Sequence, residues 1–219
     1  MAKVTALKIQ ARNKNRVNVY LDGKFAFGLV KIEAARLRIG QEVTAAAVAQ
    51  LAAADESESA YEQALHFLSY RPRSESEIRR YLKKKALAEA PLEAVVDRLK
   101  RAGLVDDRSF AGLWVENRSN FKPKARRALK AELRAKGVPA NDIETAVAGV
   151  DEAGAARQLA AARAPRLWRQ KLNKQEFRKK LGEYLARRGF DYETISNAVE
   201  GAWRELGGDE RNTSEESEL

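Results

Sequence analysis

The chain has 219 residues, of which 44% are apolar and 33% are charged, a composition that excludes both a membrane protein and a wholly disordered chain. Its 41 Lys and Arg exceed its 31 Asp and Glu and leave a net charge of +10, which favours an anionic partner, nucleic acid first. Because there is no cysteine and His66 is the single histidine, the sequence excludes disulfides, thiolate metal sites, cysteine nucleophiles and metal sites built on histidine pairs.

The positive charge is concentrated between residues 61 and 206, which hold 31 Lys and Arg against 20 Asp and Glu. Residues 207–219 hold one Arg against five Asp and Glu, and we expect them to form a disordered acidic tail. The longest apolar stretches, such as Thr44–Ala54, are well short of the ~20 residues that cross a bilayer, and the first ten residues lack the apolar run of a signal peptide. We therefore expect a soluble, cytoplasmic chain with no membrane partner.

Residues 1–55 predict a small N-terminal β-rich domain with short helices. Apolar residues alternate with polar ones from Val17 to Leu29, on both sides of Asp22-Gly23, a pair that tolerates the positive φ of a tight hairpin turn. The segment Val4–Gln10 predicts a third strand, which a lone hairpin needs for stability.

A polar and acidic run, Asp55–Ser59, separates two stretches with helical spacing, residues 43–53 and 61–70. We interpret this run as a linker or a helix start. The boundary of the N-terminal domain is therefore placed there.

Residues 60–206 contain three copies of one helical unit. Leu82, Leu133 and Leu185 align, and apolar residues recur four positions before them and ten, thirteen, fourteen and seventeen positions after them. The apolar positions ten to seventeen residues after the aligned leucine lie on one face of an amphipathic helix. The aligned leucine and the apolar residue four positions before it indicate a preceding helix, and a further helix comes first in each unit. The predicted fold is mainly α, an elongated, curved array of three tandem three-helix repeats behind the β-hairpin-containing domain. They are called repeat 1 (60–107), repeat 2 (108–151) and repeat 3 (152–206).

Helix starts are indicated by capping patterns. Ser74-x-x-Glu77 predicts a capping box at the middle helix of repeat 1, and Asn141-x-x-Glu144 predicts one at the last helix of repeat 2. Asp106-Asp107 precedes the first helix of repeat 2 and is interpreted as a helix cap.

Cations recur at matched positions of the middle helices. Arg79 and Lys83 of repeat 1 align with Lys130 and Arg134 of repeat 2, each pair one turn apart on one face. Like charges at this spacing destabilise an isolated helix by ~0.2–0.5 kcal/mol per pair, so their repetition favours an anionic partner over a merely solvated face. The residues predicted to bind nucleic acid or a filament are Arg71, Arg73, Arg79, Arg80, Lys83, Lys84, Lys122, Lys124, Arg126, Arg127, Lys130 and Arg134.

Repeat 3 departs from this pattern, because Gly182 and Ala186 replace the aligned cations and its charge moves to neighbouring turns. We expect repeat 3 to contribute to a different surface.

Several aromatic residues stand among the cations and could stack on nucleic-acid bases. We favour packing between helices for most of them, and packing in the core for all three tryptophans. These residues are Tyr70, Tyr81, Phe121 and Tyr184, and Trp114, Trp168 and Trp203.

The sequence predicts no catalytic residue, no metal site and no cofactor. His66 lies in an apolar helical stretch and is interpreted as a packing or hydrogen-bonded residue. A metal-dependent nuclease built on Asp106, Asp107 and Glu116 is kept as an alternative, although no further carboxylates are identified for it. Neither GxxxxGK[ST] nor GxGxxG occurs, which excludes the common phosphate-binding loops.

Three stretches resemble the RecX family of regulatory proteins, bacterial modulators of the RecA recombinase. The resemblance covers roughly residues 60–205 and includes Arg71-Pro-Arg-Ser74, Asp106-Asp107 followed by Phe110-Ala111, and Lys136-Gly137, in that order. The turn Tyr20-Leu-Asp-Gly23 also looks like part of the N-terminal extension of longer members. The stretches are residues 64–85, 103–118 and 123–138.

The resemblance implies a binding protein that is not an enzyme. Its implied partners are RecA, the RecA–DNA filament and single- or double-stranded DNA. Its implied action is to oppose filament extension and the ATPase, strand-exchange and coprotease activities of RecA, in recombination and the SOS response. We expect a monomer. The alternative is a general DNA-binding helical-repeat protein without a RecA role, and a pure protein scaffold is a further one.

Overall fold

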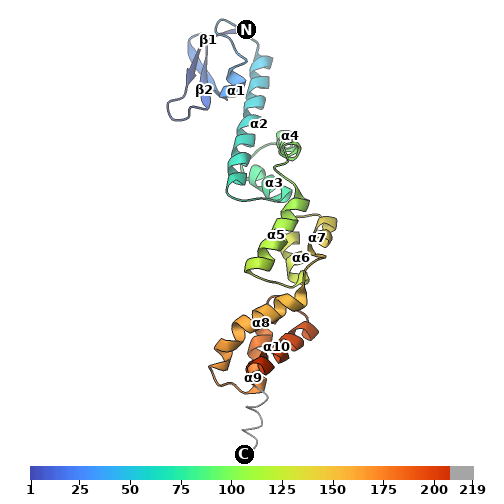
Figure 1. Ribbon diagram of the computed structural model, residues 1–219. Helices are drawn as coiled ribbons and strands as arrows, with labels where there is room; N and C mark the ends of the chain where they lie inside the picture. The colour runs from blue at the N-terminus through green and yellow to red at the C-terminus, as the bar shows by residue number, and fades with distance from the viewer. Residues whose placement is uncertain (208–219) are drawn as a thin grey trace, which may run out of the picture. The chain divides into compact units, whose positions relative to one another are not determined.

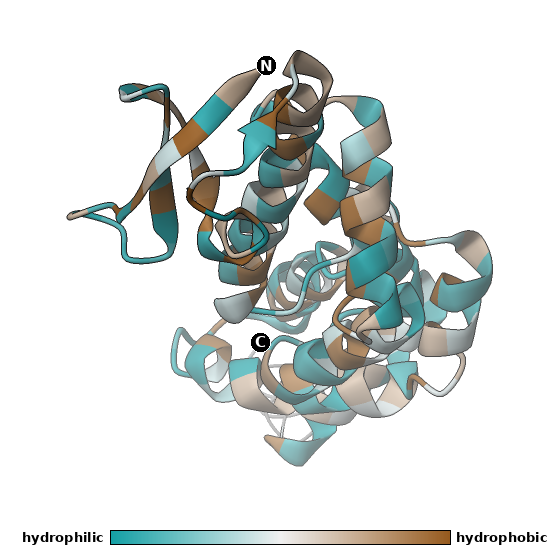
Figure 2. Cartoon of the chain, turned by 90° about the horizontal axis from the view of Figure 1, so that it is seen from above, coloured by the Kyte–Doolittle hydropathy of each residue, from teal (hydrophilic) through white to brown (hydrophobic). Residues whose placement is uncertain are grey.

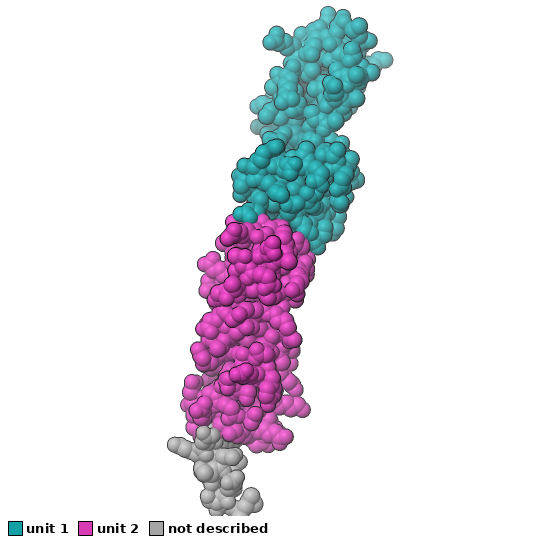
Figure 3. Space-filling view, turned by 90° about the vertical axis from the view of Figure 1, so that its right-hand side faces the viewer, with its two compact units in different colours: residues 1–106 teal, residues 107–219 magenta. Residues whose placement is uncertain are grey.

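The computed structural model describes residues 1–207 and divides into two compact units, with the boundary between Asp106 and Asp107 (Figure 3). A β-sheet domain is followed by three three-helix domains, which confirms the predicted fold class at that level. The acidic tail predicted for residues 207–219 lies outside the described residues, apart from Gly207.

The N-terminal sheet has four antiparallel strands in the order β3-β2-β1-β4. The predicted hairpin is confirmed, with Asp22 (φ 48°) and Gly23 (φ 83°) in its turn, and so is the third strand. The fourth strand was not predicted, because two residues are too short to show alternation. The elements are β1 (Ala2–Ile9), β2 (Arg16–Leu21), β3 (Lys24–Val30), α1 (Lys31–Ala34) and β4 (Glu42–Val43).

The alternation predicted for the hairpin fails at Phe25. Val19 pairs with Phe27 and Tyr20 with Phe25, so the register shifts by one residue between them. Such a bulge changes the face to which the following side chains point. Phe25 is 59% exposed and contacts Tyr20 edge-on at 6.0 Å, whereas Leu29 at the other end of β3 is buried. Figure 2 shows that the chain carries hydrophobic and hydrophilic residues in turn along its strands.

The segment interpreted as a linker is instead the middle of one continuous helix, α2 (Ala45–Ser69), so that interpretation was wrong. Asp55 accepts hydrogen bonds from Arg16 Nη2 at 2.7 Å and from the backbone nitrogen of Val30 at 2.5 Å. Glu58 pairs with Arg98 at 2.5 Å. These two residues thus join the middle of α2 to the sheet and to Arg98 of repeat 1. Figure 1 shows α2 running from the sheet to the other helices of repeat 1.

Repeat 1 is completed by α3 (Glu75–Lys84) and α4 (Glu89–Arg101), which pack against α2. The predicted capping box is confirmed: Ser74 Oγ accepts from the backbone nitrogen of Glu77 at 3.2 Å, and Glu77 reaches back to the Ser74 nitrogen. The aligned Leu82 is fully buried, as the repeat pattern requires.

Repeats 2 and 3 form the second unit. The aligned residues Leu133 and Leu185 are fully buried, and Trp203 is 2% exposed between Trp168 and Phe177. The helices are α5 (Asp107–Phe121), α6 (Arg126–Ala135) and α7 (Ala140–Val147) in repeat 2, and α8 (Glu152–Trp168), α9 (Lys174–Ala186) and α10 (Tyr192–Glu205) in repeat 3. None of the helices within residues 1–207 offers an apolar run of the length that crossing a bilayer requires.

The capping box predicted at Asn141 was wrong. The helix α7 begins one residue earlier, at Ala140, and its N-cap Pro139 provides no side-chain cap. Proline holds φ near the helical value, here −59°, so the helix starts at that point and Asn141 falls inside its first turn. A capping box that was not predicted joins Asn173 and Glu176 at the start of α9.

Replacing Asp55 with Ala is expected to loosen the sheet from α2. The substitution leaves the Val30 amide and the Arg16 guanidinium without their carboxylate, which should lower the free energy of unfolding of the first unit by about 1–3 kcal/mol. Hydrogen exchange of the Val30 amide, followed by mass spectrometry, should become faster. Glu56→Ala is the matched control, because Glu56 is exposed on the same helix and should change stability by less than about 0.5 kcal/mol. Unchanged exchange at Val30 in Asp55→Ala would contradict this account of α2.

Candidate nucleic-acid interface

The aligned cation of repeat 1, Arg79, is held by carboxylates of its own repeat. Its guanidinium makes a bidentate pair with Glu93 and donates through Nε to Glu75 at 2.7 Å. The hydrogen bonds to Glu93 and then Glu75 raise the pKa of Arg79. Burial opposes ionisation of Glu75, but hydrogen bonds from Lys100 and Arg79 outweigh it and lower the pKa of Glu75.

The same ion pair recurs in repeat 2. Lys130 Nζ contacts Glu144 at 2.5 Å, and Lys130 and Glu144 occupy the positions of Arg79 and Glu93. In repeat 3 the corresponding positions are Gly182 and Ser196, so both partners are absent together. The repetition of this cation therefore has an intramolecular cause, a pair that joins the middle and last helices of a repeat.

Two more of the predicted residues support the start of α3. Arg71 makes a bidentate pair with Glu77, the carboxylate of the capping box, at 2.8 and 3.1 Å. Arg73 lies over the ring of Phe67 at 3.9 Å, and burial followed by the nearby Arg71 lowers its pKa. Both guanidinium groups thus have structural contacts within repeat 1.

Lys124 belongs to a cluster around Glu132. The carboxylate of Glu132 accepts hydrogen bonds from Lys124, from Arg118 Nε at 2.8 Å and from Trp114 Nε1 at 2.8 Å. Burial raises the pKa of Glu132, but the hydrogen bonds from Lys124, Arg118 and Trp114 prevail and lower it. The cluster joins α5 to α6.

Four of the predicted residues line one groove at the junction of repeats 2 and 3, here called the α6 groove. The groove has a volume of about 420 Å³, and its other walls come from the start of α8 and the turn before α10. The spacing of the α6 cations by three, four and seven residues places their side chains on one side of the helix. The lining residues are Arg126, Arg127, Lys130, Arg134, Glu152, Gly189 and Asp191.

Backbone contacts position the α6 groove. The nitrogen of Ala125 donates to the carbonyl of Arg188 at 3.0 Å, just before α6 begins. Gly189 has φ +90°, and a Cβ at that position would lie 2.8 Å from the Cβ of Ala128. A glycine is therefore required for α6 to approach repeat 3 this closely.

Charge in the α6 groove is only partly balanced. Arg126 pairs with Glu152 at 3.3 Å, while Arg127 and Arg134 are exposed and make no ion pair with any residue in the described part of the chain. Asp191 caps α10; the backbone hydrogen bond from Thr194 is the main cause of its lowered pKa, and Arg127 contributes. The groove therefore contains two exposed cations that no carboxylate of the described residues pairs with.

The remaining predicted residues lie outside the α6 groove. Arg80 is exposed and donates to the Ser76 carbonyl at 3.2 Å. Lys83 pairs with Glu89 at 3.2 Å, both side chains being more than half exposed. Lys84 and Lys122 are exposed, at the ends of α3 and α5.

The aromatic residues divide into two kinds. Tyr81 stacks on Phe67 at 4.3 Å, and Tyr184 lies beneath Arg188 at 3.8 Å, which confirms packing for these two. Packing was wrong for Tyr70 and Phe121, which are 71% and 76% exposed. The three tryptophans pack against the cores, as predicted.

His66 is hydrogen-bonded, as expected, but it is not part of a core. Its Nε2 lies 3.1 Å from the Tyr70 hydroxyl, and the two rings meet edge-on at 5.1 Å on the exposed side of α2.

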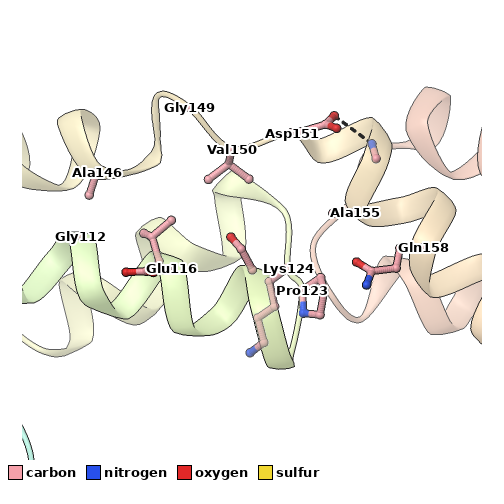
Figure 4. Close-up of a pocket in the computed structure, with 13 residues that line it drawn as sticks. Gly112, Glu116, Pro123, Lys124, Ala146, Gly149, Val150, Asp151, Ala155 and Gln158 are labelled. Carbon is pink, nitrogen blue, oxygen red and sulfur yellow. Dashed lines mark hydrogen bonds between the residues drawn. The ribbon is translucent and has the colours of Figure 1, made fainter.

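A second hollow in this unit lies between α5 and the start of α8 and has a volume of about 510 Å³ (Figure 4). Its walls are mostly small residues, with Glu116 and Gln158 on opposite sides, and the Asp151 carboxylate accepts from the Gly154 nitrogen at 2.9 Å. The nuclease alternative requires Glu116 beside Asp107, but the two residues are nine positions apart, which is about 13 Å along α5. Residues 1–207 contain no group of three His, Cys, Asp or Glu side chains that could hold a metal ion.

The sequence interpretation missed the partners of the α6 groove, Glu152, Gly189 and Asp191. Gly189 had a visible signal, because it aligns with Gly137 of repeat 2 in the turn between the last two helices. Its contact with Ala128 joins two repeats, and no pattern within one repeat reveals such a contact.

Four family models match the chain in order. They are the "Regulatory protein RecX N-terminal domain" over residues 2–44, and the first, second and third three-helix domains of RecX over residues 60–99, 106–147 and 151–199. The chain belongs to the RecX family. This is a family of regulatory proteins, and the matched domains are those described above.

Relatives and solved structures agree with the RecX assignment. The "Regulatory protein RecX" of Limosilactobacillus reuteri (strain DSM 20016) is 34% identical over 206 residues, which cover 91% of this chain and 77% of the relative. That of Bacillus subtilis (strain 168) is 31% identical over 207 residues, with the same coverage of both chains. A crystal structure of a regulatory protein RecX is 30% identical, covers 90% of this chain and 98% of its own, and superposes with a TM-score of 0.70. RecX from Lactobacillus salivarius, 24% identical with a TM-score of 0.60, covers 68% of this chain and 97% of its own and shares the fold.

Replacing Glu132 with Gln is expected to destabilise repeat 2 by about 1–3 kcal/mol, because two cations and the Trp114 indole lose a half-buried carboxylate. The pKa of Glu132 is lower in the folded chain, so its stabilising effect is present above its unfolded pKa and is lost as the pH falls through the folded value. Urea unfolding should therefore separate wild type from Glu132→Gln at pH 7, and less so as the pH is lowered below about 4.

Glu144→Gln is the control for that measurement. It removes the carboxylate of a more exposed ion pair with Lys130 and should lower the free energy of unfolding by less than about 1 kcal/mol. If both variants lose the same free energy of unfolding at pH 7, the Glu132 cluster does not stabilise repeat 2 more than an exposed ion pair does.

Proposed function

We propose that this RecX-family chain is a negative modulator of RecA. It binds RecA and the RecA–DNA filament, opposes filament extension, and thereby reduces the ATPase, strand-exchange and coprotease activities of RecA in recombination and the SOS response. Membership of a family of regulatory proteins supports a regulatory role, and the motifs shared with that family support RecA as its target.

The α6 groove is the observation that carries the proposed contact with DNA. Arg127 and Arg134 are exposed there without an ion pair among the described residues, and Arg126 and Lys130 are each held by a single carboxylate. A phosphate of DNA can take the place of those carboxylates, because it offers the same kind of charge-assisted hydrogen bond. The groove thus fits the sugar–phosphate backbone.

The predicted residues of repeat 1 take a different part in the proposed function. Arg71 and Arg79 are ion-paired within repeat 1 and position α3. Arg80 and Lys84, together with Lys83 in its exposed pair with Glu89, are left as the outward cations of α3. One molecule that contacts DNA through the α6 groove and RecA through other surfaces bridges neighbouring subunits. Bridging stabilises a filament conformation that is unsuited to extension or nucleotide turnover.

The decisive experiment adds the purified chain to RecA on single-stranded DNA and follows ATP hydrolysis and filament length. At sub-stoichiometric to equimolar amounts, both should decrease. Unchanged hydrolysis and length, together with retained binding to bare DNA, would favour the alternative of a DNA-binding helical-repeat protein without a RecA role. Absence of DNA binding at low salt would instead favour a protein scaffold.

Arg127→Gln combined with Arg134→Gln is expected to weaken binding of single-stranded DNA by removing two unpaired cations from the α6 groove. The slope of log K against log salt should become shallower by about 1.4, since each neutralised phosphate contact contributes about 0.7. Fluorescence anisotropy of a labelled oligonucleotide between 50 and 200 mM salt measures this slope.

Lys14→Gln combined with Lys24→Gln is the matched control, because it removes the same charge from exposed positions of the N-terminal domain. This control should leave the slope within about 0.3 of wild type. If both double variants shift the slope equally, the α6 groove is not the contact site.

A further inference from the structure

Repeat 3 carries a cluster of exposed cations around the turn from α8 to α9. Arg166 and Arg169 lie three residues apart in and just after the last turn of α8, and Lys171 follows in the turn with φ +51°. Lys180 on α9 reaches across to this turn, where its Nζ contacts Gln170 Oε1 at 3.2 Å. Lys179 precedes it on α9 and is exposed. These five residues, Arg166, Arg169, Lys171, Lys179 and Lys180, are called the α8–α9 patch.

The cations of the α8–α9 patch have no carboxylate partner within residues 1–207. Their recorded polar contacts are to neutral groups, the Gln170 amide for Lys180 and the Pro165 carbonyl for Arg169 at 3.4 Å. By contrast, Arg178, which precedes Lys179 on α9, forms an ion pair with Glu200 at 3.1 Å. The patch therefore presents unbalanced positive charge to solvent. The ion-paired cations of repeat 1 differ from it, because carboxylates of their own repeat balance their charge.

A further cation connects this patch with the α6 groove. Arg187 is exposed and lies seven residues after Lys180, two turns along the same face of α9. That spacing is about 10 Å, and Gly189 of the α6 groove follows two residues later. Glu183 lies between the two cations on that face and is the carboxylate along this path. Cations spread over such a length fit a chain of phosphates, which repeats its charge along the strand, rather than one small anion.

We propose that the α8–α9 patch is a second contact surface for single-stranded DNA, and that one strand runs from it past Arg187 into the α6 groove. The proposal rests on the proposed contact between the α6 groove and DNA, and it extends that contact to a part of repeat 3 where the aligned cations are absent. The path from Lys180 to Arg187 covers seven residues at the end of α9, or about 10 Å, which is longer than one small anion and spans more than one phosphate of a strand. A strand that fills both surfaces is therefore longer than one held by the groove alone.

The test uses the full chain with a fourfold substitution, Arg166→Gln, Arg169→Gln, Lys179→Gln and Lys180→Gln. The control removes the same charge from the first unit through Arg12→Gln, Lys14→Gln, Lys24→Gln and Arg38→Gln, all at exposed positions. Circular dichroism checks that both variants fold. Fluorescence anisotropy then gives the affinity of each chain for labelled oligothymidylates of 5 and 20 nucleotides, and the salt slope for the 20-mer.

The patch variant is expected to bind the 20-mer at least tenfold more weakly than the control variant, with a salt slope shallower by about 2.8, the value for four lost phosphate contacts. Its affinity for the 5-mer, which the α6 groove accommodates, should stay within about twofold of the control.

Three results would overturn the proposal and differ in what else they reject. If the patch and control variants bind the 20-mer equally, the second surface is rejected while the groove contact stands. If the patch variant loses the 5-mer as strongly as the 20-mer, the continuous path from patch to groove is rejected. If the wild-type chain binds neither oligonucleotide at 50 mM salt, the proposed DNA contact of the α6 groove falls as well.

Discussion

The pairing of cations with carboxylates inside each repeat is the constraint on which the surface of this chain depends. Each three-helix module is small, and its helices are joined across their polar edges by ion pairs such as Arg79–Glu93 and Lys130–Glu144. A cation engaged in this way stabilises the module and is available to a partner only when that partner displaces its carboxylate. The net charge of +10 therefore says less about binding than the positions at which the internal carboxylates are missing.

Substitution of one aligned position explains why repeat 2 differs from repeat 1. Glu75, which holds both Arg79 and Lys100 in repeat 1, is replaced at the matching position by Arg126 in repeat 2. The exchange removes a carboxylate from the face of α6 and adds a cation to it, and the α6 groove is its result. In repeat 3 the same position is Arg178, which turns to Glu200 instead.

The order of elements could be predicted from the sequence because it depends on local patterns: the Asp22-Gly23 turn, the apolar columns aligned on Leu82, and the capping box at Ser74. The interpretation of residues 55–59 as a linker or a helix start was wrong. Asp55 makes this stretch look polar in the sequence, but its carboxylate accepts hydrogen bonds from Arg16 and from the Val30 amide, which are far away in the sequence. Of the candidate site, the four α6 cations were predicted together, but the ion pairs that engage Arg71 and Arg79 could not be, because a charge pattern does not reveal its own partners. The elongated, curved shape of the array stays a prediction.

The junction between repeats 2 and 3 combines one ion pair, Arg126–Glu152, with close contacts that carry no charge. A backbone hydrogen bond from Ala125 to Arg188 and the close approach of Gly189 to Ala128 hold the two walls of the α6 groove together. Dissolved ions screen ion pairs but leave such contacts almost unchanged. These two contacts keep the width of the groove from depending on the Arg126–Glu152 ion pair alone, so we expect the response of a bound polyanion to salt to come mainly from the release of its condensed counterions.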